Sequence, residues 1–133
     1  MTRFTIDAPT LLHLVDGDLT VDPAHQLVAP SSIRSEALER MLSDVRAGNR
    51  TEKDARQRHT QMTELKIRVL GDRMSRWTAW KIAREMDWDT LRDAEYLAVT
   101  KLQADALVSV DPELVAKADG VVPTAPLEDL LQA

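Results

Sequence analysis

The chain has 133 residues, of which 44% are hydrophobic and 29% charged, and it contains no cysteine. This composition is that of an ordinary globular protein and excludes a disordered or fibrous one, while the length predicts a single domain over residues 1–133. The lack of cysteine excludes disulfides, thiolate metal sites and cysteine nucleophiles. No apolar run reaches the roughly 20 residues that span a bilayer, and the first residues lack the apolar stretch of a secretory signal. We therefore expect a cytoplasmic protein with no membrane partner.

The net charge of −5 is unevenly distributed along the chain. Residues 34–84 hold 13 Lys or Arg against 7 Asp or Glu, whereas residues 85–133 hold 3 against 11. An acidic chain is on average a poor nucleic-acid binder, but a basic middle segment between acidic ends can make one face positive. For any single run of charges, a solvated helix face is the simpler explanation.

The first predicted elements are short. Phe4–Ile6 is an apolar-leaning run that predicts a strand, and Asp7 ends it. The apolar residues of Leu11–Val15 predict a short helix, which the turn-forming residues 16–18 stop. A second brief strand is predicted at Gln26–Val28.

The middle of the chain carries stronger helix signals. A helix is predicted from Ser31 or Ser32, either of which can cap it, with apolar residues at helical spacing up to residues 47–48. Thr51–Leu65 predicts a polar helix with a weak apolar face. Ile67–Leu70 alternates like a strand.

Two more helices and a buried strand follow. The helices are predicted at Trp77–Met86 and Leu91–Leu102. Ala106–Val110 is short, nearly continuous in apolar residues and rich in β-branched ones, which is typical of a buried parallel strand. Val121–Val122 predicts a last edge strand, and Leu127–Leu131 a final helical turn or two. The alternation of strands and helices predicts an α/β/α sandwich with a central, mainly parallel sheet of about five short strands.

Four acidic residues are expected to meet at one edge of this sheet. Asp7 and Asp111 each follow a predicted strand, and the carboxyl ends of parallel strands lie along the same edge. Glu36 and Asp93 reach that edge from the starts of two helices. Four acids close together repel one another and have raised pKa values unless a cation lies between them.

Carboxylate oxygens are the ligands that Mg²⁺ and Mn²⁺ prefer, whereas zinc normally takes His or Cys. The three histidines, His13, His25 and His59, have no metal-ligand spacing, and a surface or structural role is the simpler interpretation of each. A chain with 22 acidic residues offers many sets of four, so the residues alone indicate a hard-cation site only weakly.

Four segments in a fixed order resemble the motifs of one protein family. They are Phe4-Thr5-Ile6-Asp7, the helix start from Ala29 to Ala37 with Glu36, the block Asp93-Ala94-Glu95-Tyr96-Leu97-Ala98, and Ala106-Leu107-Val108-Ser109-Val110-Asp111. Together they are similar to the PIN domain, in particular to VapC-type toxin ribonucleases of bacterial toxin–antitoxin pairs. The resemblance covers nearly the whole chain, and the block that begins at Asp93 is its most specific part.

The resemblance implies a metal-dependent endoribonuclease with a PIN-like fold. Its catalytic and metal-binding residues would be Asp7, Glu36, Asp93 and Asp111, holding one or two Mg²⁺ or Mn²⁺ ions. Cleavage would leave a 5′-phosphate and a 3′-hydroxyl on the RNA. The resemblance also implies a cognate antitoxin as partner and a homodimer.

Other residues are candidates for contacts with RNA or a partner. In the basic segment, and next to the acidic cluster, the candidates for RNA binding are Arg46, Arg50, Lys53, Arg56, Arg58 and Arg92. Arg92 is equally suited to pair with a carboxylate. Trp77, Trp80 and Trp88 could stack on bases, but the spacing of Trp77 and Trp80 is more typical of a core or an interface. The predicted helices within 8–16 and 51–65 are candidates for docking an antitoxin helix or a second copy.

One departure and two alternatives remain. Family members usually carry a small polar residue soon after the first acid, where this chain has Ala8-Pro9, with Thr10 one place later. This difference keeps open a catalytically silent PIN-like module that binds RNA or a protein without cutting. A phosphoacceptor receiver domain also gathers acids at a sheet edge, but Asp7 has no acidic neighbour and Asp111 stands where that fold needs a lysine.

Overall fold

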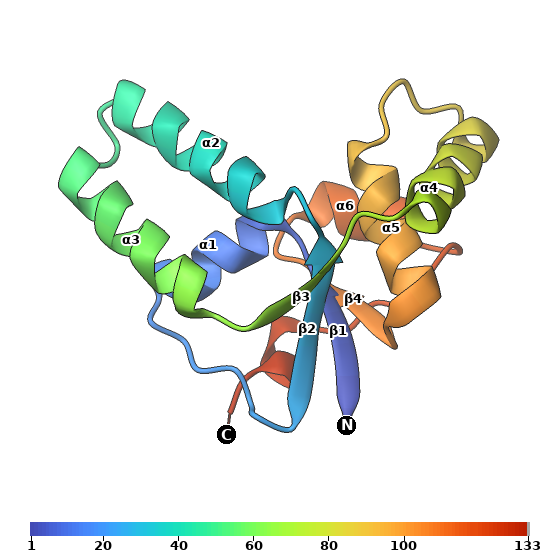
Figure 1. Ribbon diagram of the computed structural model, residues 1–133, viewed down its shortest axis with the longest axis horizontal. Coiled ribbons are helices and arrows are strands. Elements are labelled where there is room, and N and C mark those ends of the chain that lie inside the picture. Colours follow the sequence, from blue (N-terminus) through green and yellow to red (C-terminus); the bar gives the residue numbers. More distant parts are fainter. Residues whose placement is uncertain (133) are drawn as a thin grey trace.

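The computed structural model describes residues 1–132, and Figure 1 shows a parallel sheet with helices on both sides. The strands are β1 (Thr2–Ile6), β2 (His25–Pro30), β3 (Ile67–Leu70) and β4 (Ala106–Val108). The helices are α1 (Ala8–Asp16), α2 (Ile33–Arg46), α3 (Glu52–Glu64), α4 (Arg73–Met86), α5 (Arg92–Gln103) and α6 (Pro112–Ala118), followed by a 3₁₀ turn, η1 (Leu127–Leu130). The predicted α/β class and parallel sheet are confirmed.

All strand pairings are parallel, and the strand order is β3-β2-β1-β4. Helices α1, α2 and α3 contact one another on one side of the sheet, while α5 packs on β1, β2 and β4 and carries α4 on its outer side (Figure 1). Because β1 is central, its carboxyl end and the residue after it are covered from both sides. This position explains why Asp7 is only 3% exposed.

The prediction of about five strands is wrong: the described residues form a four-stranded sheet. Strand β4 ends at Val108, two residues earlier than predicted, and residues 121–122 form no strand. The chain instead returns beside β4 through a single bridge between Leu107 and Thr124. Pro123 has no N–H to donate, so it cannot extend a ladder of hydrogen bonds there.

Capping side chains set the starts of α1, α3, α4 and α6. The serine cap predicted for α2 is not formed, because Ser32 makes no side-chain hydrogen bond at the helix start, and α5 has no side-chain cap either. Asp7 caps α1 by accepting a hydrogen bond from the Thr10 amide, and Pro9 fits the first turn, where no intrahelical N–H is needed. Helix α1 therefore begins earlier than its apolar residues suggest. Asp111 caps α6 in the same way, accepting from the Glu113 amide at 3.0 Å.

The apolar residues of α1 are buried in the core of the chain. Leu11, Leu12, Leu14 and Val15 are all at most 8% exposed. The prediction that this helix offers a docking face is therefore wrong, because its apolar side packs inside the same molecule. None of the helices within residues 1–132 is long and apolar enough to span a bilayer.

Candidate functional site

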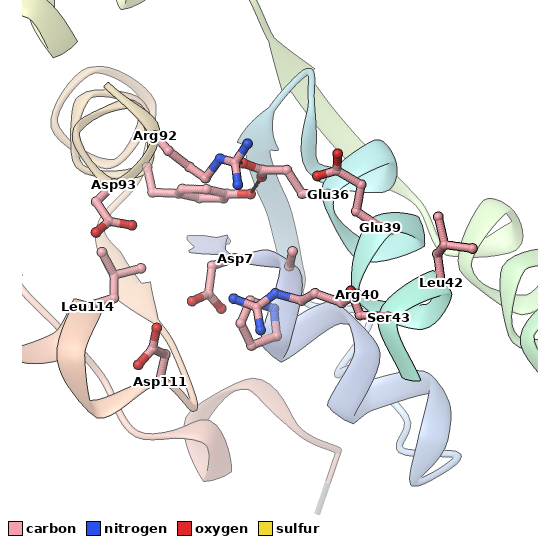
Figure 2. A pocket seen from close by; sticks show the side chains of 13 residues that line it. Asp7, Glu36, Glu39, Arg40, Leu42, Ser43, Arg92, Asp93, Asp111 and Leu114 are labelled. Carbon is pink, nitrogen blue, oxygen red and sulfur yellow. Dashed lines mark hydrogen bonds and ion pairs between the residues drawn. The ribbon is translucent and has the colours of Figure 1, made fainter. Parts of the chain in front are cut away.

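A pocket of about 390 Å³ lies at the carboxyl edge of the sheet, and the four predicted acids all line it (Figure 2). They come from four different elements: the β1–α1 junction, α2, α5 and the start of α6. The remaining lining residues include Pro9, Glu39, Arg40, Arg92, Tyr96 and Leu114. The topology thus brings together side chains that are up to 104 positions apart in the sequence, from Asp7 to Asp111.

Asp7 lies at the base of this pocket and both of its carboxylate oxygens are held. The Thr10 amide, at 3.2 Å, and the Thr10 hydroxyl donate to Oδ1, and the Ser109 hydroxyl donates to Oδ2 at 2.7 Å. Burial raises the pKa of Asp7, although these hydrogen bonds oppose the rise. Ala8 and Pro9 have no polar side chain, so Thr10 supplies the hydroxyl that the small polar residue of the family would place beside the first acid.

Thr10 also connects Asp7 to the loop after β4. Its hydroxyl oxygen accepts a hydrogen bond from the Val110 amide at 3.0 Å, and the Ser109 hydroxyl accepts one from the Asp111 amide at 3.0 Å. The segment that carries Asp111 is thereby fixed to the residues that hold Asp7.

Glu36 projects from the first turn of α2 toward α5. The Tyr96 hydroxyl donates to Glu36 Oε2, and Arg92 Nε lies 2.9 Å from Oε1. The Glu36 side chain is 11% exposed, and burial raises the pKa of its carboxyl. Burial and the hydrogen bond to Glu36 raise the pKa of Tyr96, which keeps its hydroxyl protonated as a donor. Arg92 thus pairs with a carboxylate, which is one of the two roles considered for it; the other is contact with RNA.

Asp93 has a cation of its own, Lys117 from α6. Lys117 Nζ lies 2.6 Å from Asp93 Oδ2 and 5.3 Å from the ring centroid of Trp88. The hydrogen bond to Asp93 raises the pKa of Lys117, so the ammonium form is favoured. Trp88 is half-buried beneath this lysine and packs against the hydrophobic core.

The donor chemistry of the pocket fits a hard divalent cation, because four carboxylates line it and no softer ligand is needed. Within residues 1–132, however, no three His, Cys, Asp or Glu side chains are grouped so that they could hold a metal ion. Glu36 is turned toward Arg92 and Tyr96, and Asp93 toward Lys117. Metal binding here requires these side chains to leave their present partners.

The basic residues predicted to contact RNA separate into three groups. Arg92 lines the pocket, and Arg46, Lys53 and Arg56 are exposed away from it. Arg50 is only 11% exposed and is surrounded by carboxylates: Asp16 at 2.8 Å, Asp44 at 3.4 Å and Asp54 at 2.7 Å. Arg58 lies 3.6 Å from Asp16 and 3.4 Å from Asp54, and it also donates to the Val15 carbonyl. Arg50 and Arg58 therefore join α1, α2 and α3, a structural role that accounts for both residues without RNA.

This ion-pair cluster gives a prediction for pH dependence. The hydrogen bond from Arg50 lowers the pKa of Asp16, so the stability that Asp16 contributes is present above its unfolded pKa of about 3.9 and is lost as pH falls through the lower folded value. We expect Asp16→Asn to lower the free energy of unfolding at pH 7 and to have little effect near pH 2.5. Urea denaturation of both proteins at the two pH values measures this difference, and an equal loss at both would contradict it.

Sequence reasoning missed two partners of the acids. Tyr96 follows Asp93 by three positions on α5, and this spacing could have placed both on one helix face. Lys117 follows Asp111 by six positions on a helix that was not predicted, so no local signal connected it with Asp93. Glu39 and Arg40, which also line the pocket, share the α2 face with Glu36.

The chain was compared with known proteins. No family model matches it, and no curated protein does. Among solved structures, PAE2754 from Pyrobaculum aerophilum aligns with 96% of this chain and 91% of its own, at 24% identity and a TM-score of 0.74. VapC20 of Mycobacterium tuberculosis, a toxin that cleaves the sarcin–ricin loop, aligns with 92% of this chain and 99% of its own, at 17% identity and a TM-score of 0.58. The chain therefore has the α/β fold of these two proteins, a PIN-like fold with a four-stranded parallel sheet.

Proposed function

We propose that this protein is a metal-dependent endoribonuclease and the toxin of a toxin–antitoxin pair. The observation that carries the proposal is the convergence of Asp7, Glu36, Asp93 and Asp111 on one pocket at the carboxyl edge of a parallel sheet. The likeness of the fold to VapC20, a toxin that cleaves the sarcin–ricin loop, supports it.

The proposed metal ligands are the four acids. Asp7 and Asp93 would bind Mg²⁺ or Mn²⁺ directly, and Glu36 and Asp111 would bind a second ion or act through waters. When bound, such an ion makes a water more acidic and neutralises charge on a phosphodiester that is being cut.

The neighbouring side chains have defined tasks in this proposal. Thr10 and Ser109 fix the orientation of Asp7, so its carboxylate does not have to be ordered when a ligand arrives. Tyr96 holds Glu36 against α5. Arg92 lines the pocket and its side chain is 65% exposed. Its guanidinium can therefore leave Glu36 and bind a substrate phosphate instead, which it would hold and orient.

The proposal includes the partners and the location implied by the resemblance: a cognate antitoxin, an RNA substrate, a homodimer and a cytoplasmic setting. For the antitoxin, the exposed polar face of α3 remains the candidate contact, since α1 is buried in the core.

A cleavage assay tests the proposal. Purified protein is incubated with a structured RNA in buffer with Mg²⁺, with Mn²⁺ or with EDTA, and the ends of the products are mapped. We expect cutting only with a divalent ion, leaving 5′-phosphates and 3′-hydroxyls. Cutting that persists in EDTA, or 2′,3′-cyclic phosphate ends, would contradict the proposed chemistry.

One observation favours the second candidate, a silent PIN-like module that binds without cutting. Arg92 and Lys117 already neutralise two of the four acids, so the pocket is not arranged around an ion. Binding of RNA or a protein, with no cleavage in Mg²⁺, Mn²⁺ or EDTA, would support this candidate and exclude the nuclease.

The contact between Lys117 and Asp93 gives a prediction for metal affinity. An ion that binds Asp93 must displace the Lys117 ammonium, and an ion pair of this partial exposure is worth up to about 1 kcal/mol. We expect Lys117→Met to bind Mn²⁺ about fivefold more tightly than the wild type, measured by isothermal titration calorimetry. The control is Lys66→Met, an exposed lysine that does not line the pocket. An unchanged Mn²⁺ affinity in Lys117→Met would contradict the displacement of Lys117 by the ion.

A further inference from the structure

The exposed side of α4 carries two tryptophans that stack on each other. The rings of Trp77 and Trp80 are 5.9 Å apart between centroids and 7° from parallel. Their exposed fractions are 53% and 46%, so of the two roles that their spacing suggested, core or interface, the core is excluded. Helix α4 packs against the molecule through Ala79, Ile82 and Ala83 instead.

Basic residues surround this tryptophan pair. Arg73 precedes Trp77 by four positions and Arg84 follows Trp80 by four, so all four residues lie along one face of the helix. Lys81 of α4 and Lys101 of α5 line the same shallow surface as the two rings. We call these six residues the α4 stripe: Arg73, Trp77, Trp80, Lys81, Arg84 and Lys101.

The charge of the stripe selects its ligand. Its four charged members are basic, against two neighbouring acids: Glu85 on the same surface and Asp72 beside Arg73. This side of α4 is therefore basic on balance, although the whole chain has a net charge of −5. A second copy packed antiparallel through α4 would bring Arg73 of one copy against Arg84 of the other, and like charges there are destabilising. The complementary ligand is therefore an anion that also has aromatic rings on which the two tryptophans can stack.

Single-stranded RNA has both properties. Proteins bind it through positive side chains that follow its phosphates and aromatic rings on which its bases stack. The stripe extends about 16 Å from Arg73 to Arg84, at 1.5 Å per helical residue. Double-stranded RNA is recognised mainly by its shape, and it does not present its bases for stacking.

We propose that the α4 stripe is a binding site for single-stranded RNA outside the acidic pocket. The two surfaces belong to neighbouring helices, because the carboxyl end of α4 leads through residues 87–91 into the first turn of α5, where Arg92 and Asp93 line the pocket (Figure 1). The inference deepens the proposed function, on which its choice of ligand rests.

The test is a binding measurement that needs no cleavage. A fluorescein-labelled, unstructured RNA of 12 nucleotides is titrated with protein in EDTA, and its anisotropy is followed together with tryptophan emission. For the wild type we expect saturable binding that quenches the tryptophans. For Trp77→Leu and Trp80→Leu, which keep an apolar side chain at an exposed position, we expect about tenfold weaker binding.

A charge variant tests the phosphate contacts separately. We expect Arg73→Gln/Arg84→Gln to bind more weakly and to lower the slope of log affinity against log salt by about one. The matched control is Arg68→Gln, an exposed arginine outside the stripe, which should leave the affinity unchanged. Circular dichroism melting establishes that each variant is folded.

The outcomes separate this inference from the proposed function. Unchanged RNA affinity in the tryptophan variants overturns the stripe whether or not the protein cuts RNA. Stripe-dependent binding without any cleavage supports the stripe and overturns only the nuclease. If the wild type sediments as a dimer and the tryptophan variants as monomers with undiminished RNA affinity, the stripe is an interface between copies and the inference is wrong. Binding of an acidic peptide through the tryptophans, with RNA unbound, overturns it as well.

Discussion

Asp7→Asn is expected to lose RNA cleavage by at least about a hundredfold while keeping the fold. Asp7 is the most buried of the four acids, and its charge is the feature that a hard cation requires. Asparagine removes this charge but keeps the size of the side chain. The measurement is the rate of cleavage of a structured RNA with Mn²⁺, alongside calorimetric titration of the variant with Mn²⁺.

The same substitution should not destabilise the protein. Asparagine caps helices as well as aspartate does, so the bond from the Thr10 amide that begins α1 is preserved. Burial raises the pKa of Asp7, which means that the folded protein is less stable with this carboxyl ionised. We therefore expect Asp7→Asn to melt at the same temperature as the wild type or higher. Glu64→Gln, an exposed acid at the end of α3, is the control for activity. Full activity in Asp7→Asn would contradict the assignment of the pocket.

Arg50→Met is expected to give the largest loss of stability among the changes considered. Arg50 is 11% exposed, and it donates hydrogen bonds to Asp16, Asp44 and Asp54, which come from three different segments. Removing the cation leaves Asp44 without its ion pair, and leaves Asp16 and Asp54 to share the more distant Arg58. From the usual strength of hydrogen bonds to charged groups, we expect the free energy of unfolding to fall by about 2–3 kcal/mol and the melting temperature by about 10 °C.

Thermal unfolding at pH 7 measures this effect. Lys53→Met, an exposed lysine at the start of α3, is the matched control and should melt within about 1 °C of the wild type. A melting temperature of Arg50→Met equal to that of the control would show that the ion-pair cluster adds nothing to stability. RNA affinity should be the same in Arg50→Met and the wild type under conditions where both are folded.

The position of the acids was predictable because it follows from topology. A run such as Ala106–Val110 predicts a buried parallel strand, and residues after such strands share one edge of the sheet. The expectation that Asp7 and Asp111 meet at that edge needed no tertiary detail. Helical periodicity and capping were similarly sufficient to predict most helices, although the true ends of α1 and α4 depend on the caps Asp7 and Asp72.

The partners of the charged residues were not predictable from local sequence. A run of arginines looks the same whether it faces phosphate or carboxylate. Arg50 is committed to Asp16, which is 34 positions away, and only the packing of α1 against α2 and α3 brings them together. Lys117 and Asp93 are 24 positions apart, and this pair too forms only through the tertiary structure. The tryptophans are a further case, because the spacing of Trp77 and Trp80 does not tell which face of α4 is buried.

The arrangement of the four acids has a consequence for protein synthesis. Strand β1, which ends beside Asp7, pairs on one side with residues 106–108, and Ser109 and Asp111 follow directly. A growing polypeptide on the ribosome therefore holds its first acid 102 residues before Ser109, which binds the second carboxylate oxygen of Asp7, exists. A chain that stops before residue 109 contains the basic segments but no complete pocket. If the protein is harmful to its own cell, that harm requires translation to have passed residue 111.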